Sequence, residues 1–187
     1  MDFSWNIAAV VGVPGVGKTT ICKSVSRAIG CHYVNYGDLM LEIAQKNNLA
    51  STDDEMFSLD INIQEKIWKT AALQIKELEN VLVDLHGVDQ SDIGYILSLP
   101  IEILTPDLII IIQAPYEDVL TRRIGDKSKK RIMESFKVFK EHKNILKISM
   151  SVCSVICGCT FSIIENDDFR ECQEKMIDVL TSGNVHQ

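Results

Sequence analysis

Residues 12–19 read G-V-P-G-V-G-K-T and match the phosphate-binding pattern G-x-x-x-x-G-K-[ST] at every fixed position. An apolar, β-branched run over residues 7–11 precedes the pattern and predicts a buried strand. Apolar residues then recur at helical spacing over residues 21–29, so the loop joins a strand to the N-terminus of a helix. Glycines let several backbone N–H groups point at one anion, and the helix dipole adds positive potential there. The sequence therefore predicts a nucleotide-binding loop in which Lys18 reaches the outer phosphates and the Thr19 hydroxyl ligates Mg²⁺.

The length and composition indicate one globular domain and argue against some classes of partner. The chain has 187 residues, of which 46% are hydrophobic and 24% charged, so we expect a single domain over residues 1–187 with a full core. Its formal net charge of −7 argues against nucleic acid as a partner, because there is no basic excess to neutralise backbone phosphates. The N-terminal residues lack the basic stretch and long apolar run of a signal peptide. We therefore expect a cytoplasmic protein that acts on small molecules.

Residues 148–164 carry no charge, which raises the question of a membrane span. A spanning helix needs about 20 predominantly apolar residues, whereas this run is shorter, contains several hydroxyl side chains and is interrupted by Gly158. We expect instead a helix that ends near Cys157, a glycine turn and a strand, and hence no membrane partner.

The cysteines give no sign of a disulfide framework or a metal site. They are Cys22, Cys31, Cys153, Cys157, Cys159 and Cys172, and without a signal peptide we expect reduced, mostly buried thiols. Three of them cluster near residue 157, but no C-x-x-C pair accompanies them. His142, the nearest histidine, lies well upstream, so the spacing does not favour a metal site.

Predicted strands alternate with predicted helices along the chain. The strands cover residues 7–11, 31–35, 81–84, 108–112 and 159–164. The first predicted helix follows the phosphate-binding loop and ends at Gly30, and the second begins at an N-cap at Asp38. The next three helices cover about residues 62–79, 115–123 and 133–157. The last helix is capped by Asp167 or Asp168. The alternation predicts an α/β fold in which helices cover both faces of a five-stranded parallel sheet.

Three segments depart from the simple alternation. Residues 37–80 are too many for a plain crossover helix and predict a helical insertion where a second substrate could dock. Residues 125–132 are polar and basic and predict a short flap, for which Gly125 could serve as a hinge. We expect residues 182–187 to form a flexible tail.

Asp84 ends the predicted strand 81–84, at the edge where open α/β sheets bind ligands. A carboxylate one strand away from the phosphate-binding loop can hold Mg²⁺ directly or through water, and we favour this role over that of a strand-end aspartate capping a turn. His86 would lie on the same loop near the phosphates, although a single loop histidine is as often structural.

The densest basic cluster consists of Arg122, Arg123, Lys127, Lys129, Lys130 and Arg131. Phosphoryl transfer needs positive charge around the developing equatorial oxygens, which a closing loop can supply. We assign this role to Arg122 and Arg123, near the helix end that faces the site. The lysines fit a solvated surface run equally well. Taken together, the residues indicate a Mg-nucleotide protein of kinase type.

The chain resembles the archaeal type of adenylate kinase nearly from end to end. The resemblance rests on residues 12–20, V-N-Y-G at 34–37, E-I-A-Q at 42–45, V-D-L-H at 83–86, P-D-L-I-I at 106–110, R-R-I-G-D at 122–126, E-H at 141–142 and I-I-E-N at 163–166. The D-x-H after the third predicted strand is the more specific mark, because the phosphate-binding loop alone occurs in many families. With Gly87 it is also similar to the D-x-H-G of the small nuclear and ribosome-assembly adenylate kinases, which rank second because their C-terminal half is shorter.

The resemblance implies a P-loop NTPase fold of three αβα layers with a helical monophosphate-binding insertion. It implies Mg²⁺-dependent reversible transfer from ATP to AMP, giving two ADP, and a homotrimer. Thr19 and Asp84 would lie at the metal, Gly37 and Asp38 on the AMP side, and Lys18, Arg122 and Arg123 around the transferred phosphate. The expected nucleotide contacts are Gly12, Pro14, Gly15, Val16, Gly17, Lys18, Thr19, Thr20, Gly37, Asp38 and His86. Positioning and electrostatics suffice for the reaction, and no covalent intermediate is needed.

The sequence departs from the family pattern where arginines are expected. Phe57 replaces an arginine of the insertion, and Leu146-Lys147 replaces an N-R pair. In the flap, Lys129 replaces the first arginine of an R-x-R-D pattern and Ile132 replaces its carboxylate. Each lost charge-assisted contact costs about 1.5–3 kcal/mol, so we expect reduced AMP affinity or turnover unless Lys66 or Lys69 substitutes.

Two other functions stay open. One is an ATP-binding protein or ATPase that controls assembly with a partner and has little or no AMP kinase activity. The other is a kinase for another monophosphate, such as UMP or CMP. A guanine-nucleotide switch is disfavoured because the chain has no N-K-x-D motif.

Overall fold

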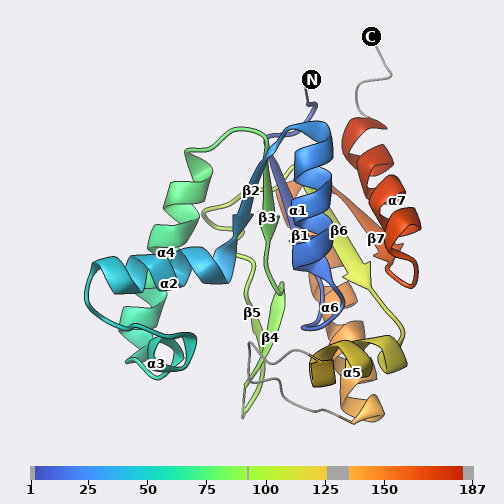
Figure 1. The fold of residues 1–187 in the computed structure, drawn as a ribbon. Helices are drawn as coiled ribbons and strands as arrows, with labels where there is room; N and C mark the ends of the chain where they lie inside the picture. Colours follow the sequence, from blue (N-terminus) through green and yellow to red (C-terminus); the bar gives the residue numbers. More distant parts are fainter. Residues whose placement is uncertain (1–2, 92, 126–134, 183–187) are drawn as a thin grey trace.

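The computed structural model describes residues 3–91, 93–125 and 135–182 (Figure 1). The strands are β1 (Ile7–Val11), β2 (His32–Asn35), β3 (Val81–Asp84), β4 (Val88–Ser91), β5 (Gly94–Leu97), β6 (Leu108–Gln113) and β7 (Thr160–Glu165). The helices are α1 (Lys18–Ile29), α2 (Tyr36–Lys46), α3 (Asp53–Phe57), α4 (Ile61–Lys76), α5 (Tyr116–Gly125), α6 (Phe136–Cys157) and α7 (Phe169–Thr181).

The larger sheet has five strands in the order β2-β3-β1-β6-β7, and every neighbouring pair is parallel. Every residue of β1 and β6 is buried, because helices cover both faces of the sheet. In Figure 1, α1 and α7 lie in front of the sheet and α6 lies behind it. The predicted three-layer αβα fold with a five-stranded parallel sheet is confirmed.

The carboxyl edge of this sheet positions the phosphate-binding loop. β1 ends at Val11 and α1 begins at Lys18, so residues 12–17 form the turn between them, as predicted. α5 and the β4–β5 pair lie at the same edge, which is the lower edge in Figure 1. Open α/β sheets bind ligands where their parallel strands end, so the candidate site belongs here.

Three helices, α2, α3 and α4, lie between β2 and β3 in the chain. α2 and α4 pack against each other to one side of the sheet, and the Tyr36 hydroxyl donates a hydrogen bond to the backbone oxygen of Trp68 at 2.6 Å (Figure 1). The helix predicted over about 62–79 is α4. α3 was not predicted, since a helix of five residues is too short to show an apolar period.

The predicted N-cap of α2 is wrong by three residues. Asn35 caps this helix, because its side-chain oxygen accepts a hydrogen bond from the backbone N–H of Asp38 at 3.0 Å. Asp38 lies inside the first turn, where a negative charge suits the helix dipole. The strand β2 therefore passes into α2 with no intervening loop.

An antiparallel pair, β4 with β5, was not predicted either. His142 of α6 contacts both strands of the pair. Its Nε2 lies 3.0 Å from the backbone oxygen of Val88, and its ring centre lies 5.5 Å from the ring centre of Tyr95. The strands have four residues each and mix polar with apolar side chains, so they lack a clear period-2 pattern.

The predicted flap over 125–132 lies outside the described residues, apart from Gly125 at the end of α5. The predicted tail over 182–187 does so too, apart from Ser182, the C-cap of α7.

The uncharged run 148–164 forms the second half of α6, a turn at Gly158 with φ 66°, and β7, as expected. Among the described residues, no helix is both long and apolar enough to cross a bilayer.

All six cysteines are free thiols, three buried and three half-buried. Burial raises the pKa of Cys31, Cys159 and Cys172 to about 11, so these thiols stay protonated near neutral pH.

Candidate nucleotide-binding site

The loop between β1 and α1 offers backbone donors that no side chain caps. The cap position of α1 is Gly17, at φ 94°, and neither a capping side chain nor an acidic residue lies in the first turn within the described chain. A Cβ at Gly17 would lie 2.5 Å from Nδ2 of Asn166, so only glycine fits there. The first N–H groups of α1 and the positive end of its dipole are thus available to an anion.

Lys18 is held within the same loop. Its side chain is only 6% exposed, and Nζ donates a hydrogen bond to the backbone oxygen of Gly12 at 2.6 Å. Gly12 itself packs against β6, where a Cβ would lie 2.5 Å from the backbone oxygen of Ile112. Its N–H donates to the backbone oxygen of His86 at 3.2 Å. Neighbouring strands therefore fix the loop that carries the ammonium group.

Asp84, at the carboxyl end of β3, is 2% exposed and gathers three donors. Its Oδ2 accepts hydrogen bonds from Thr19 Oγ1 at 2.7 Å, Asn35 Nδ2 at 3.1 Å and the Tyr33 hydroxyl at 3.2 Å. Burial and then the charge of Asp84 raise the pKa of Tyr33, so its hydroxyl stays a neutral donor. All three of these bonds converge on the same carboxylate oxygen.

The donor set fits a magnesium ion that arrives with a nucleotide. Mg²⁺ prefers oxygen ligands and commonly takes one or two from the protein, with waters and phosphates completing the shell. Thr19 and Asp84 supply a hydroxyl and a carboxylate 2.7 Å apart. In the described parts of the chain, no three histidine, cysteine or acidic side chains form a cage that would hold an ion by themselves. Thr19 and Asp84 are thus the residues that would face the metal.

Arg122 and Arg123 of α5 both donate to the backbone of the loop. Arg123 is 7% exposed, and its Nε and a terminal nitrogen lie 2.9 and 2.7 Å from the backbone oxygen of Pro14. Arg122 donates to the backbone oxygens of Val16 and Asn166, each at 3.0 Å. Asn166 adds its own bond to Val16 at 2.7 Å. The two arginines therefore lie beside the loop, and their contact with a transferred phosphate stays a prediction.

The His86 side chain points its Nδ1 at Asp89, 2.6 Å from Oδ1. Partial burial would raise the pKa of Asp89, but the hydrogen bond and charge of His86 outweigh this effect and lower it. His86 thus adjoins the loop through its backbone, while its ring pairs with a carboxylate. Its predicted contact with nucleotide stays a prediction.

The insertion shows where the departures from the family pattern fall. Gly37 and Asp38 lie in the first turn of α2, beside the capping oxygen of Asn35. Phe57 ends α3 and is 61% exposed, so no charge is available at that position.

That Lys66 or Lys69 substitutes for a missing arginine stays a prediction. Of the lysines considered as substitutes, Lys69 pairs with Glu65 at 2.6 Å. Leu146, at the asparagine position of the N-R pair, belongs to the core at 1% exposure, and Lys147 stands at the arginine position.

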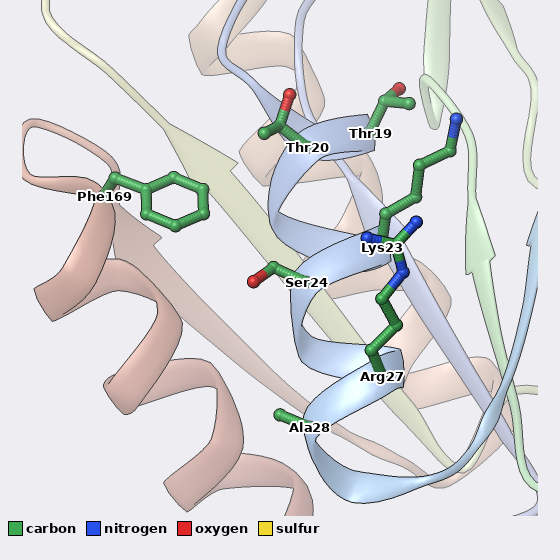
Figure 2. Close-up of a pocket in the computed structure, with 7 residues that line it drawn as sticks. All are labelled: Thr19, Thr20, Lys23, Ser24, Arg27, Ala28 and Phe169. Atoms are coloured by element: carbon green, nitrogen blue, oxygen red, sulfur yellow. The ribbon is translucent and has the colours of Figure 1, made fainter.

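An open depression runs along the outer side of α1 (Figure 2). It is lined by Thr19, Thr20, Lys23, Ser24, Arg27, Ala28 and Phe169. Figure 2 shows the Lys23 side chain extending along the helix toward Thr19, while the Phe169 ring approaches from the start of α7. The Lys23 ammonium lies 5.8 Å from the ring centre of Tyr33, so a cation that the sequence did not single out borders the Thr19–Tyr33–Asp84 group.

Several polar residues of the site were missed in the sequence. Asn35 ends β2, Asn166 follows β7 and Gln113 ends β6, so all three lie at the carboxyl ends of parallel strands, the signal that identified Asp84. Among the described residues, both amide atoms of Gln113 are buried without a hydrogen bond, which leaves them for a water or a ligand. Tyr33 had no such signal, because it lies inside a strand.

Solved structures share the fold at low sequence identity. Shikimate kinase from Acinetobacter baumannii, in complex with shikimate, matches with a TM-score of 0.63 and 16% identity, covering 97% of this chain and 96% of its own. Shikimate kinase from Aquifex aeolicus matches with a TM-score of 0.60 and 13% identity, covering 97% of this chain and 99% of its own. These likenesses support the three-layer αβα fold.

Sequence relatives are closer. Residues 11–140 match the family model described as an AAA domain. An adenylate kinase homolog of Methanothermobacter thermautotrophicus is 45% identical over 175 residues, 94% of this chain and 92% of the relative. An adenylate kinase of Methanocaldococcus jannaschii is 33% identical over 187 residues, 93% of this chain and 97% of the relative. The chain belongs to the archaeal-type adenylate kinase family.

Proposed function

We propose that the protein is an adenylate kinase that transfers the terminal phosphoryl group of Mg·ATP reversibly to AMP, giving two ADP. The observation that carries the proposal is the pairing of Thr19 with the buried Asp84 at 2.7 Å, beside the phosphate-binding loop and at the base of a helical insertion. The relatives named adenylate kinase support the choice of substrates.

Each residue has a physical role in this reaction. The loop amides and Lys18 bind and orient the phosphates, so that the donor phosphoryl group faces the insertion. Arg122 and Arg123 keep the loop backbone in place and add positive charge next to it. Magnesium, when bound, neutralises phosphate charge, and Thr19 and Asp84 would hold it there. The chain itself needs no nucleophile, because the acceptor phosphate attacks directly.

The acceptor side is the weaker part of the assignment. Phe57 supplies no charge where the family pattern has an arginine, so a phosphate entering beside α2 meets fewer cations than that pattern provides unless Lys66 or Lys69 substitutes. This observation keeps a second candidate open, an ATP-dependent assembly protein with weak AMP kinase activity, and also a kinase for a different monophosphate.

Formation of ADP from Mg·ATP with AMP, CMP, UMP or GMP tests the proposal. We expect turnover with AMP, and we expect Lys18→Ala to abolish it by removing the ammonium group from the phosphates. Lys175→Ala is the matched control, since Lys175 forms an exposed pair with Glu171 on α7. Tight ATP binding without turnover of any monophosphate would favour the assembly protein, and preference for CMP or UMP would reassign the substrate.

The homotrimer implied by the resemblance and the cytoplasmic location expected from the charge and the N-terminal residues are proposals of the same kind. The homotrimer rests on the family alone.

A further inference from the structure

The Asn35 side chain makes two hydrogen bonds, one to the proposed metal side of the site and one to the start of α2 on the monophosphate side. Its Nδ2 donates to Oδ2 of Asp84 at 3.1 Å, and its Oδ1 accepts from the backbone N–H of Asp38 at 3.0 Å. Asp84 ionised can only accept, and a backbone N–H can only donate, so the orientation of the amide is fixed by its partners. One planar group thus joins the carboxylate of β3 to the first turn of α2.

The backbone around Asn35 makes this junction short. Asn35 is the last residue of β2, lies opposite Asp84 in the parallel register, and is also the N-cap of α2. No loop residues separate β2 from α2, so a displacement at the end of β2 cannot be taken up by a flexible connection before it reaches α2. Tyr36, the next residue, bonds the backbone of Trp68 and so connects α2 to α4.

Other side chains can replace only half of this function. Serine and aspartate are as good as asparagine at an N-cap, so either would keep α2 capped. Serine is too short to bridge to Asp84 as well, and aspartate would set a second carboxylate against it. Asparagine combines an acceptor with a donor at the required reach.

We propose that Asn35 is a positioning residue that couples the metal side of the site to the monophosphate side, so that binding of Mg·nucleotide orders the start of α2. The proposal rests on the proposed function, which places Asp84 at the metal and α2 beside the acceptor. The amide donates to the same Oδ2 of Asp84 that accepts from Thr19, so Asn35 contacts the carboxylate directly beside the other residue assigned to the metal. A shift of Asp84 on metal binding is transmitted through the amide to the helix cap.

Hydrogen exchange of the α2 first turn, with a non-hydrolysable ATP analogue and either Mg²⁺ or EDTA, tests this coupling without requiring turnover. In the unmodified protein we expect Mg²⁺ to slow exchange at Asp38 and its neighbours by about three- to tenfold, the range of one hydrogen bond. In Asn35→Ser we expect the cap to persist and the Mg²⁺ effect to disappear, while thermal stability falls because the bond to the buried carboxylate is lost. A merely structural role would lower stability in the same way but leave the Mg²⁺ effect intact.

Two further variants separate the parts of the junction. Tyr33→Phe removes another donor to Asp84 but leaves the Asn35 bridge, so the Mg²⁺ effect on α2 should remain. Thr52→Ala removes the cap of α3, whose hydroxyl accepts from Glu55 N–H at 3.2 Å, and should leave the effect unchanged. An unchanged Mg²⁺ effect in Asn35→Ser, or none in the unmodified protein, would overturn the proposal.

Calorimetric titration with AMP distinguishes this inference from the assigned function. We expect AMP to bind several-fold more tightly with Mg²⁺ than with EDTA, and Asn35→Ser to abolish that difference. If AMP does not bind in either condition, the proposed function fails, and the exchange measurement still decides whether Asn35 couples the two elements.

Discussion

The guanidinium group of Arg123 is buried against the loop that it supports, which makes its shape as important as its charge. Its two nitrogens share the Pro14 backbone oxygen at 2.9 and 2.7 Å. A lysine keeps the charge but offers a point donor on a flexible stem. We expect Arg123→Lys to lower the free energy of unfolding by about 1.5–3 kcal/mol and to raise KM for ATP.

Urea unfolding and steady-state kinetics check this expectation. Arg122→Lys is the matched control, because the Arg122 side chain is 36% exposed and should contribute less to stability. Unchanged stability combined with a large loss of kcat in Arg123→Lys would instead indicate that Arg123 contacts the transferred phosphate.

At the scale of single residues, the sequence predicted the residues that stand at a fixed place in a motif or at the end of a predicted strand. Lys18 and Thr19 follow from the loop pattern, and Asp84 follows from the end of an apolar strand. Arg123 could be placed near the site, but its bond to a backbone oxygen leaves no trace in the sequence. Asn35 ends a predicted strand, as Asp84 does, but asparagine is also common in turns and the sequence favours Asp38 as the cap of the next helix.

Among the elements, the segment after β3 depends on a close approach at Gly87. Its φ is 84°, and a Cβ there would lie 2.9 Å from Cβ of Val11 and 3.0 Å from a methyl carbon of Leu146. We expect Gly87→Ala to lower the free energy of unfolding by about 2–4 kcal/mol, because backbone strain and overpacking add.

Gly158→Ala provides the comparison. Gly158 has φ 66°, but a Cβ there would meet no other described atom within 4 Å, so only the backbone strain of about 1–2 kcal/mol applies. Denaturant titrations followed by circular dichroism measure both variants. Equal losses would mean that the neighbours of Gly87 yield without cost.

The elements that were predicted correctly are those with a long or fully apolar pattern. β1, β3 and β6 are buried on both faces and read as continuous apolar runs, and α6 is long enough to show its period. α3 and the β4–β5 pair are short, and tertiary contacts such as that of His142 with Val88 decide their conformation. Propensity alone gives no access to such contacts.

At the scale of the whole molecule, the oligomeric state can be decided by a single measurement of mass in solution. The resemblance implies a homotrimer, so we expect light scattering after size exclusion to give three times the chain mass of 21.0 kDa. The mass should stay constant across a tenfold dilution if the trimer is stable. A mass of one chain at all concentrations would contradict the trimer while leaving the nucleotide site unaffected.

The overall architecture followed from the sequence because alternation of strands and helices admits few arrangements once the connections are right-handed. Strand order at the sheet edges and the packing of α2 on α4 did not follow, since both depend on side chains far apart in the chain.

The two tryptophans lie in separate parts of the molecule and give each part its own optical signal. The Trp5 indole N–H donates to the backbone oxygen of Leu180 at 2.8 Å, which joins the start of the chain to α7, whereas Trp68 belongs to α4. Fluorescence emission from Trp5 therefore reports on the packing of the domain that contains the five-stranded sheet, and emission from Trp68 reports on the helical insertion formed by α2, α3 and α4. Stopped-flow traces of two variants, each with one of the tryptophans, would show whether the helical insertion moves before the sheet domain responds.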